Sequence, residues 1–104
     1  MTSSVRLTPE AEADIRDAYD WYEAIQAGLG DRFLAAVTDG LDYMAEWPEA
    51  SPVVHEEIRR TLLQTFPYGL FYVLEEEVVI VLGCFHARRD PSAWSERTRR
   101  RPKS

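Results

Sequence analysis

The sequence predicts a two-layer α+β domain in which a helical hairpin packs on one face of a mainly antiparallel sheet. The first half of the chain repeats its apolar residues at helical spacing, whereas the second half follows the two-residue period of strands. The expected element order is therefore β-α-α-β-β-β, followed by a short C-terminal helical turn. With 104 residues and no repeat or low-complexity linker, the chain has room for one such core. The order of the strands in the sheet does not follow from the pattern.

The first strand and the first helix are expected to meet at residues 8–10. Residues 5–8 alternate as in a short strand, and Thr-Pro-Glu then provides an N-cap, a first-turn proline and a first-turn acid. Asp14 and the other charged residues of this helix are expected to face solvent, with Tyr19 and Trp21 on the flanks of the apolar stripe. The residues of that stripe recur at spacings of four and three and are Ala11, Ile15, Ala18, Tyr22 and Ile25.

A second helix follows the glycine-containing turn at residues 26–31, where Asp31 is expected to cap it. The two prolines of residues 48–52 end this helix, because proline cannot continue the hydrogen-bond ladder. The apolar stripe is broader than in the first helix, which indicates deeper burial. Its members are Phe33, Val37, Gly40, Met44 and Trp47, widened by Leu34, Leu41 and Ala45.

Three strands are expected in the second half, at residues 58–63, 68–74 and 78–85. The three glutamates at 75–77 form a polar tip, so the last two strands are predicted to pair as a hairpin. Residues 78–85 are apolar at every position, as expected of a strand in the interior of a sheet.

The charge is divided unevenly along the chain. The net charge is −6, yet from Cys84 onward seven bases stand against two acids, a local +5 that can attract an anionic partner. Residues 90–94 predict a capped helical turn, and residues 97–104 a basic flexible tail. A single domain over residues 1–96 is therefore expected.

Several classes of protein are disfavoured by composition. Cys84 has no second thiol to pair with, which excludes a disulfide framework and a two-cysteine metal knuckle within the chain. The N-terminus lacks an apolar signal-peptide core, and the longest apolar run, Val78 to Phe85, is too short to span a membrane. We expect a cytoplasmic protein with no membrane partner, no metal and no cofactor.

Four motifs, taken together in their order and spacing, resemble the ParE branch of the RelE/ParE toxins. They are Ala-x-x-Asp-Ile at 11–15, Gly-Leu-Gly-Asp-Arg-Phe at 28–33, Phe-Pro-Tyr-Gly-Leu-Phe-Tyr at 66–72 and His-x-Arg-Arg-Asp-Pro at 86–91. The resemblance spans almost the whole chain. It implies the RelE/ParE-like fold and the toxin of a type II toxin–antitoxin system of the plasmid stabilisation type. It also implies a cognate antitoxin that wraps around the toxin in a hetero-oligomer.

The expected antitoxin contacts are the aromatic side chains of the first helix: Tyr19, Trp21 and Tyr22. A partner helix in a groove or an added strand would use such a surface. For each residue taken singly, packing in the core is the alternative interpretation.

RelE-type relatives cut messenger RNA on the ribosome, which requires a group that takes the 2′-hydroxyl proton, a cation for the phosphate charge and an acid for the leaving oxygen. Two departures from the ribonuclease pattern count against this activity. Gly69 stands where those relatives carry an arginine, and Trp94 where they carry an aromatic hydroxyl; neither replacement supplies the missing charge or proton. The remaining candidates are His86, Arg88 and Arg89, with Arg60, Glu57 and Tyr68 as further possibilities.

The ParE branch is associated with inhibition of DNA gyrase, so the resemblance favours a binding inhibitor that halts growth over an enzyme. Two alternatives stay open: a ribosome-dependent mRNA endonuclease using His86 with Arg88 or Arg89, and a degenerate, non-toxic member that only binds antitoxin. The acidic first half of the chain motivates the second alternative. Either arginine could instead pair with Asp90 to hold the C-terminal turn. The expected target-binding residues are Arg59, Arg60, Arg88, Arg89 and Trp94.

Overall fold

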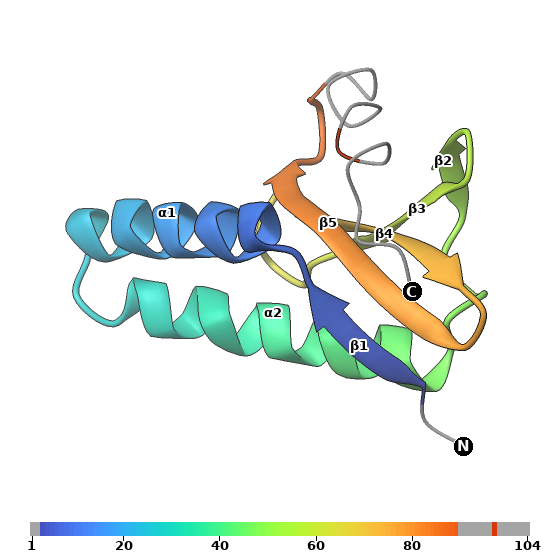
Figure 1. The fold of residues 1–104 in the computed structure, drawn as a ribbon. Helices are drawn as coiled ribbons and strands as arrows, with labels where there is room; N and C mark the ends of the chain where they lie inside the picture. Colours follow the sequence, from blue (N-terminus) through green and yellow to red (C-terminus); the bar gives the residue numbers. More distant parts are fainter. Residues whose placement is uncertain (1–2, 90–96, 98–104) are drawn as a thin grey trace.

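The computed structural model describes residues 3–89 and Arg97. The elements in chain order are β1 (Ser4–Leu7), α1 (Pro9–Ile25), α2 (Leu29–Glu46), β2 (Val53–His55), β3 (Ile58–Leu62), β4 (Tyr68–Glu75) and β5 (Val78–His86). The two helices lie side by side and pack on one face of a five-stranded sheet (Figure 1). The predicted α+β class and helical hairpin are confirmed. Strand β2 is an addition, since three residues are too few to show a period.

The strand order is β1-β5-β4-β3-β2, with β1 parallel to β5 and every other neighbouring pair antiparallel. Strand β5 is therefore interior, as its apolar run predicted. One irregularity interrupts its pairing with β4. Gly83 pairs with Phe71 and Val81 with Tyr72, so Leu82 between them has no partner on β4. Leu82 is a β-bulge, a feature that bends a strand and re-aims its groups.

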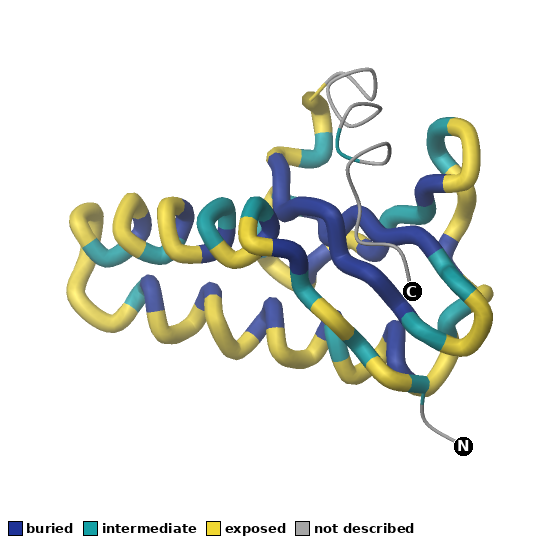
Figure 2. The backbone as a smooth tube through the Cα atoms, in the orientation of Figure 1, coloured by how far each residue is buried: buried dark blue, intermediate teal, exposed yellow. Residues whose placement is uncertain are grey.

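The buried residues concentrate in the central strands and on the inner sides of the helices (Figure 2), and they form two clusters, one on each face of the sheet. The larger cluster joins both helices to the sheet and centres on Phe33, Met44, Leu70 and Tyr72. The smaller cluster lies on the other face: Ile58, Phe71, Val73, Ile80, Leu82 and Phe85.

Three residues predicted for the apolar stripes are exposed instead. Leu34, on the side that widens the second stripe, is 38% exposed. Ile25 is 57% exposed, because the end of α1 projects beyond the sheet (Figure 1). Trp47 is 58% exposed, and its backbone at φ −129° and ψ 65° has already left the helix, so helical spacing no longer sets its direction. No helix in residues 3–89 is long and apolar enough to cross a membrane.

The two helix starts illustrate one confirmed prediction and one correction. Thr8 caps α1 as predicted, because its hydroxyl accepts a hydrogen bond from the Ala11 N–H at 3.1 Å. The predicted cap at Asp31 is wrong: α2 begins at Leu29, after Gly28 in the left-handed region at φ 91°. The Glu23 carboxylate replaces the cap by accepting bonds from the N–H groups of Gly28 and Gly30.

Candidate functional site

An open hollow of about 370 Å³ lies between α1 and the C-terminal end of β5. Helix α1 contributes Asp14, Asp17, Ala18 and Trp21, while the sheet and the residues after it contribute Tyr68, Cys84, Phe85, His86 and Arg89. Sequence motifs that are more than fifty residues apart therefore meet at one place. The lining combines aromatic rings, two carboxylates and a guanidinium.

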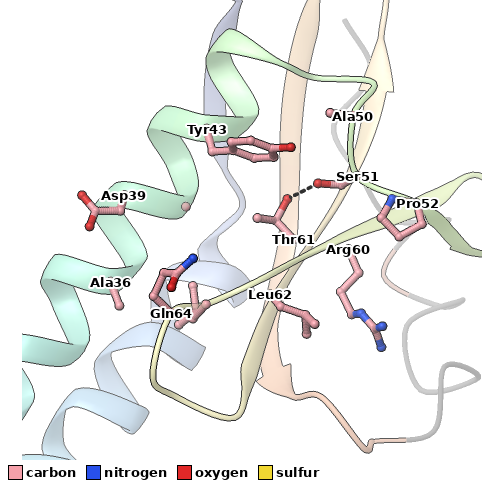
Figure 3. A pocket seen from close by; sticks show the side chains of 12 residues that line it. Ala36, Asp39, Tyr43, Ala50, Ser51, Pro52, Arg60, Thr61, Leu62 and Gln64 are labelled. Carbon is pink, nitrogen blue, oxygen red and sulfur yellow. Dashed lines mark hydrogen bonds between the residues drawn. The ribbon is translucent and has the colours of Figure 1, made fainter.

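A larger cavity of about 520 Å³ lies between α2, the segment 50–52 and β3 (Figure 3). The hydroxyls of Ser51 and Thr61 face each other in its wall at 2.7 Å. Of the residues predicted to be functional, Arg60 is the one that lines this cavity. We assign the candidate site to the smaller hollow because four such residues line it: Trp21, Tyr68, His86 and Arg89.

His86 and Tyr68 stand opposite each other at the ends of β5 and β4, with ring centroids 6.0 Å apart. The His86 side chain is exposed, and its Nδ1 accepts a bond from the Arg88 backbone N–H at 3.2 Å. Burial raises the pKa of the Tyr68 hydroxyl, and the Cys84 thiol nearby raises it further. Tyr68 therefore keeps its proton at neutral pH and can donate a hydrogen bond, but it is a poor general base.

The Cys84 thiol at the base of the hollow is not an activated nucleophile. Burial raises its pKa from 9.0 to about 12, with the Asp14 carboxylate as the second cause. A reactive cysteine needs the opposite shift. The folded state holds this proton more tightly than the unfolded chain, so its contribution to stability is present below pH 9 and declines as the pH rises through the range up to about 12.

Alkylation of Cys84 tests this description. Iodoacetamide at pH 8 is expected to modify the folded protein at least about 100-fold more slowly than the urea-unfolded chain, since both the thiolate fraction and access are reduced. Mass spectrometry of timed samples measures both rates. Equal rates in the two states would contradict the buried, protonated thiol.

Two guanidinium groups lie against the ring of Phe85. Arg89 is 4.5 Å and Arg97 is 4.4 Å from the ring centroid. Such contacts stabilise by about 0.5–2 kcal/mol each, depending on how far the cation is desolvated. The Arg88 side chain is exposed, as is that of Arg89. The end of β5 therefore presents cations beside the hollow.

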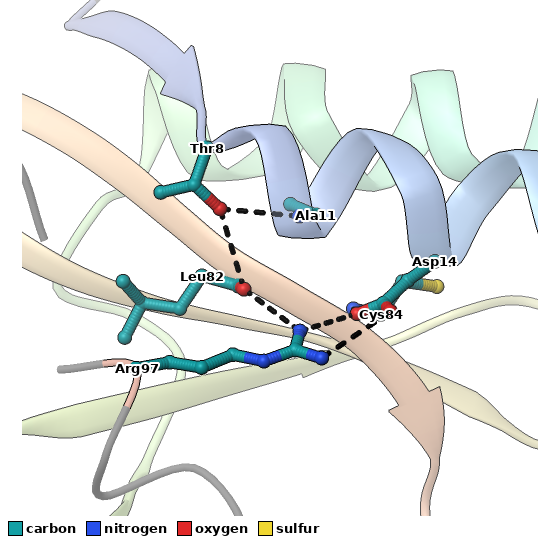
Figure 4. Close-up of polar contacts among 6 residues, drawn as sticks. All are labelled: Thr8, Ala11, Asp14, Leu82, Cys84 and Arg97. Carbon is teal, nitrogen blue, oxygen red and sulfur yellow. Dashed lines mark hydrogen bonds and ion pairs between the residues drawn. The ribbon is translucent and has the colours of Figure 1, made fainter. Parts of the chain in front are cut away.

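Asp14 belongs to a polar cluster that sequence reasoning placed in solvent, and that placement was wrong. Its carboxylate accepts the Cys84 backbone N–H at 3.1 Å and pairs with the Arg97 guanidinium at 2.6 Å (Figure 4). Arg97, the first residue of the predicted basic tail at 97–104, makes this ion pair, and the other residues of the tail lie outside the described residues. An isolated glycine within an apolar strand, Gly83, was the available signal, since it often marks a bulge or a close approach.

The three predicted antitoxin residues have different environments. Trp21 is 59% exposed on the rim of the hollow. The Tyr19 hydroxyl donates to Asp31 at 3.2 Å, so it is partly committed to holding the helical hairpin. Tyr22 is 8% exposed and lies in the aromatic part of the core. Of the three, Trp21 has the largest surface available to a partner.

The two predicted target-binding arginines of β3 contact the fold in different ways. Arg59 Nη1 donates to the backbone oxygens of Glu49 and Ser51 at 3.0 and 2.8 Å. The stem of Arg60 lies against Gly69, where an added Cβ would come within 2.9 Å of Arg60 Cγ. A long side chain at position 69 therefore has no room while Arg60 keeps this position.

Some predictions lie elsewhere or outside the described residues. Glu57 is exposed in the turn between β2 and β3 and does not line the hollow. Trp94, Asp90 and the predicted C-terminal helical turn at residues 90–94 lie outside the described residues, so their roles stay predictions. Within residues 3–89 and Arg97, no group of three or more His, Cys, Asp or Glu side chains is placed to hold a metal ion.

Comparison with known families gives one match that covers most of the chain. The model of the ParE toxin of the type II toxin–antitoxin system parDE matches residues 5–91. Comparison with curated proteins gives no match.

Solved structures with a similar fold include the chromosomal ParDE toxin–antitoxin system of P. aeruginosa, with 15% identity and a TM-score of 0.69 over 82% of this chain and 96% of the other. The RelBE2 toxin–antitoxin complex of Mycobacterium tuberculosis gives 21% and 0.58, over 83% of this chain and 99% of the other. A mutant of the E. coli toxin RelE in the free state gives 17% and 0.60, over 96% and 98%. At these identities the likeness shows the shared fold.

Proposed function

The chain belongs to the ParE toxin family of type II toxin–antitoxin systems, and from this membership we propose that it halts growth by binding and inhibiting DNA gyrase. The proposed site of contact is the cationic end of β5 beside the hollow, with Arg88 and Arg89 as principal contacts. Arg59, Arg60 and Trp94 are proposed as further contacts. The protein would act in the cytoplasm.

The packing at Gly69 is the observation that most favours binding over catalysis. The ribonuclease relatives carry an arginine at this position, and in this chain the stem of Arg60 occupies the space that such a side chain would need. Tyr68, with its raised pKa, is a poor base, and His86 is the other residue predicted for proton transfer that lines the hollow. Without an arginine at position 69, this set of groups is a weaker basis for cutting RNA than the set that the ribonuclease relatives carry.

Neutralisation by a cognate antitoxin fits the same hollow. Trp21 and Arg89 both line it, so an antitoxin segment seated on the indole would also cover the guanidinium. Inhibition would then be steric, with one surface serving both partners in turn. The ParDE and RelBE2 neighbours are themselves toxin–antitoxin systems.

A supercoiling assay with purified gyrase tests the proposal. The protein is expected to inhibit supercoiling, and the double variant Arg88→Glu/Arg89→Glu to need at least about tenfold more protein for half-inhibition, because reversing two interface charges replaces attraction by repulsion. Arg32→Glu is the matched control, since it reverses an exposed arginine on α2. Circular dichroism should show all three proteins folded.

Each alternative predicts a different result. Supercoiling that proceeds normally with the unaltered protein would overturn the gyrase proposal. Messenger RNA cleavage in expressing cells that disappears in His86→Ala would identify a ribonuclease instead. Unimpaired growth on expression without antitoxin would indicate a non-toxic, antitoxin-binding member.

A further inference from the structure

The bulge in β5 leaves a carbonyl oxygen outside the regular ladder. Leu82 has no partner on β4, and the pairing of β1 with β5 ends at Val81. The Leu82 oxygen accepts hydrogen bonds from the Thr8 hydroxyl at 3.4 Å and from Arg97 Nη1 at 3.1 Å (Figure 4). A strand irregularity thus provides an acceptor for a side chain that lies fifteen residues further along the chain.

A carboxylate completes the polar part of this site. Asp14 Oδ2 lies 2.6 Å from Arg97 Nη1, and Oδ1 lies 3.4 Å from Nη2. The Cys84 backbone N–H donates to the same Oδ2 at 3.1 Å. The two side chains are only 18% and 20% exposed, so solvent screens the pair less than a surface ion pair. A two-point contact of this kind matches the fork of a guanidinium and not a lysine ammonium.

Gly83 leaves room for the planar cation of Arg97, and the ring of Phe85 covers it. A Cβ at position 83 would lie 2.6 Å from Arg97 Nη1 and 3.0 Å from Asp14 Oδ2. The Phe85 ring is 4.4 Å from the Arg97 guanidinium carbon, a distance suited to a cation–π contact. One guanidinium is therefore contacted by a carbonyl, a carboxylate and an aromatic ring. The absence of a side chain at Gly83 leaves the space that it occupies.

From this convergence we infer that α1 and the β5 bulge form a guanidinium-binding socket, and that Arg97 fills it to anchor the basic C-terminal segment. Four basic residues follow Arg97 within six positions of the sequence, and the socket tethers them to the domain. Asp14 and Phe85 also line the candidate hollow. The socket thus fixes the origin of this basic segment next to the proposed target surface.

Chemical rescue tests the socket without any partner protein. A dye on Ser104→Cys reports how freely the C-terminus moves, and Cys84 stays unlabelled because its thiol is buried. In Arg97→Ala we expect a lower dye anisotropy and a thermal midpoint lower by about 5–10 °C. Millimolar propylguanidinium should restore part of the thermal midpoint, whereas propylammonium at the same concentration should not. Neither cation should restore the anisotropy, because a free cation fills the socket without being joined to the chain.

The matched variants separate a shaped socket from a simple charge pair. Arg97→Lys should behave like Arg97→Ala, and propylguanidinium should fail to rescue Arg97→Ala when Asp14→Asn is also present. An Arg97→Lys protein with the anisotropy and thermal midpoint of the unaltered protein would overturn the guanidinium-specific socket. So would an Arg97→Ala protein with unchanged anisotropy and midpoint. If Asp14→Asn does not fold, Gly83→Ala replaces it, and should lower anisotropy in the Arg97 protein while adding little to Arg97→Ala.

The consequence for target binding rests on the proposed function and is measured separately. Arg97→Ala, which keeps all the later basic residues, should inhibit gyrase less strongly, by a factor of about three to ten. Propylguanidinium should not restore the inhibition, because it fills the socket without tethering the basic segment; recovery of inhibition would contradict the tether and attribute the loss to the stability of the domain. Normal inhibition by Arg97→Ala would remove the link between socket and target. Failure of the unaltered protein to inhibit gyrase concerns the proposed function alone, because the rescue experiment needs no gyrase.

Discussion

Replacing Trp21 by alanine is expected to raise the dissociation constant of the cognate antitoxin about 30-fold, equivalent to ~2 kcal/mol. The indole is 59% exposed and lies at the rim of the hollow, with its ring 5.1 Å from that of Tyr22 in an edge contact. A large, rigid, exposed aromatic side chain that rests on a buried one is well suited to anchor a partner, because little conformational entropy is lost when it is covered. Isothermal titration calorimetry with purified antitoxin measures the change.

A second tryptophan offers a matched control. Trp47 is 58% exposed and immediately follows α2, outside the lining of the hollow. Trp47→Ala removes a comparable exposed ring, and we expect it to leave the dissociation constant within about twofold of the original value. Equal weakening by both variants would indicate a general effect on the fold, and an unchanged constant for Trp21→Ala would place the antitoxin on another face.

Much of the fold could be predicted because its determinants are local. Helical and strand periods, the Thr8 cap and the interior position of β5 can all be inferred from neighbouring residues. The cap of α2 could not be predicted in this way, because Glu23 reaches it from the preceding helix and accepts hydrogen bonds from N–H groups at its start, as Asp31 was expected to do. The two stripe residues at helix ends failed for a related reason. Periodicity tells neither where the sheet beneath α1 stops, which exposes Ile25, nor where α2 itself ends, which changes the direction of Trp47.

The candidate site was only partly predictable because its contacts are long-range. The sequence offers His86, Arg89 and Trp21 as candidates, but it does not predict that all three line one hollow. The pairing of Asp14 with Arg97 joins residues 83 positions apart and depends on the bulge at Leu82. No local pattern specifies which strand residue bulges or which distant arginine fills the space.

Replacing Tyr22 by alanine is the substitution for which we expect the largest loss of stability, about 3–5 kcal/mol in the free energy of unfolding. Its ring, 8% exposed, lies 5.3 Å from Phe33, 5.0 Å from Phe66 and 6.0 Å from Tyr68 between ring centroids. Removing it leaves a cavity where α1, α2 and β4 meet. Total stabilities of small domains are about 5–15 kcal/mol, so urea unfolding should show a much lower midpoint.

Tyr22→Phe separates packing from partner recognition. It keeps the ring and removes only the hydroxyl, whose pKa is raised mainly by burial and which therefore stays protonated near neutrality. We expect its unfolding free energy to change by about 1 kcal/mol or less. If it also binds antitoxin normally while Tyr22→Ala is largely unfolded, then Tyr22 contributes to neutralisation only through its packing against Trp21 and the core. A selective loss of antitoxin binding in a stable Tyr22→Phe protein would instead assign the hydroxyl a direct contact, despite its small exposed surface.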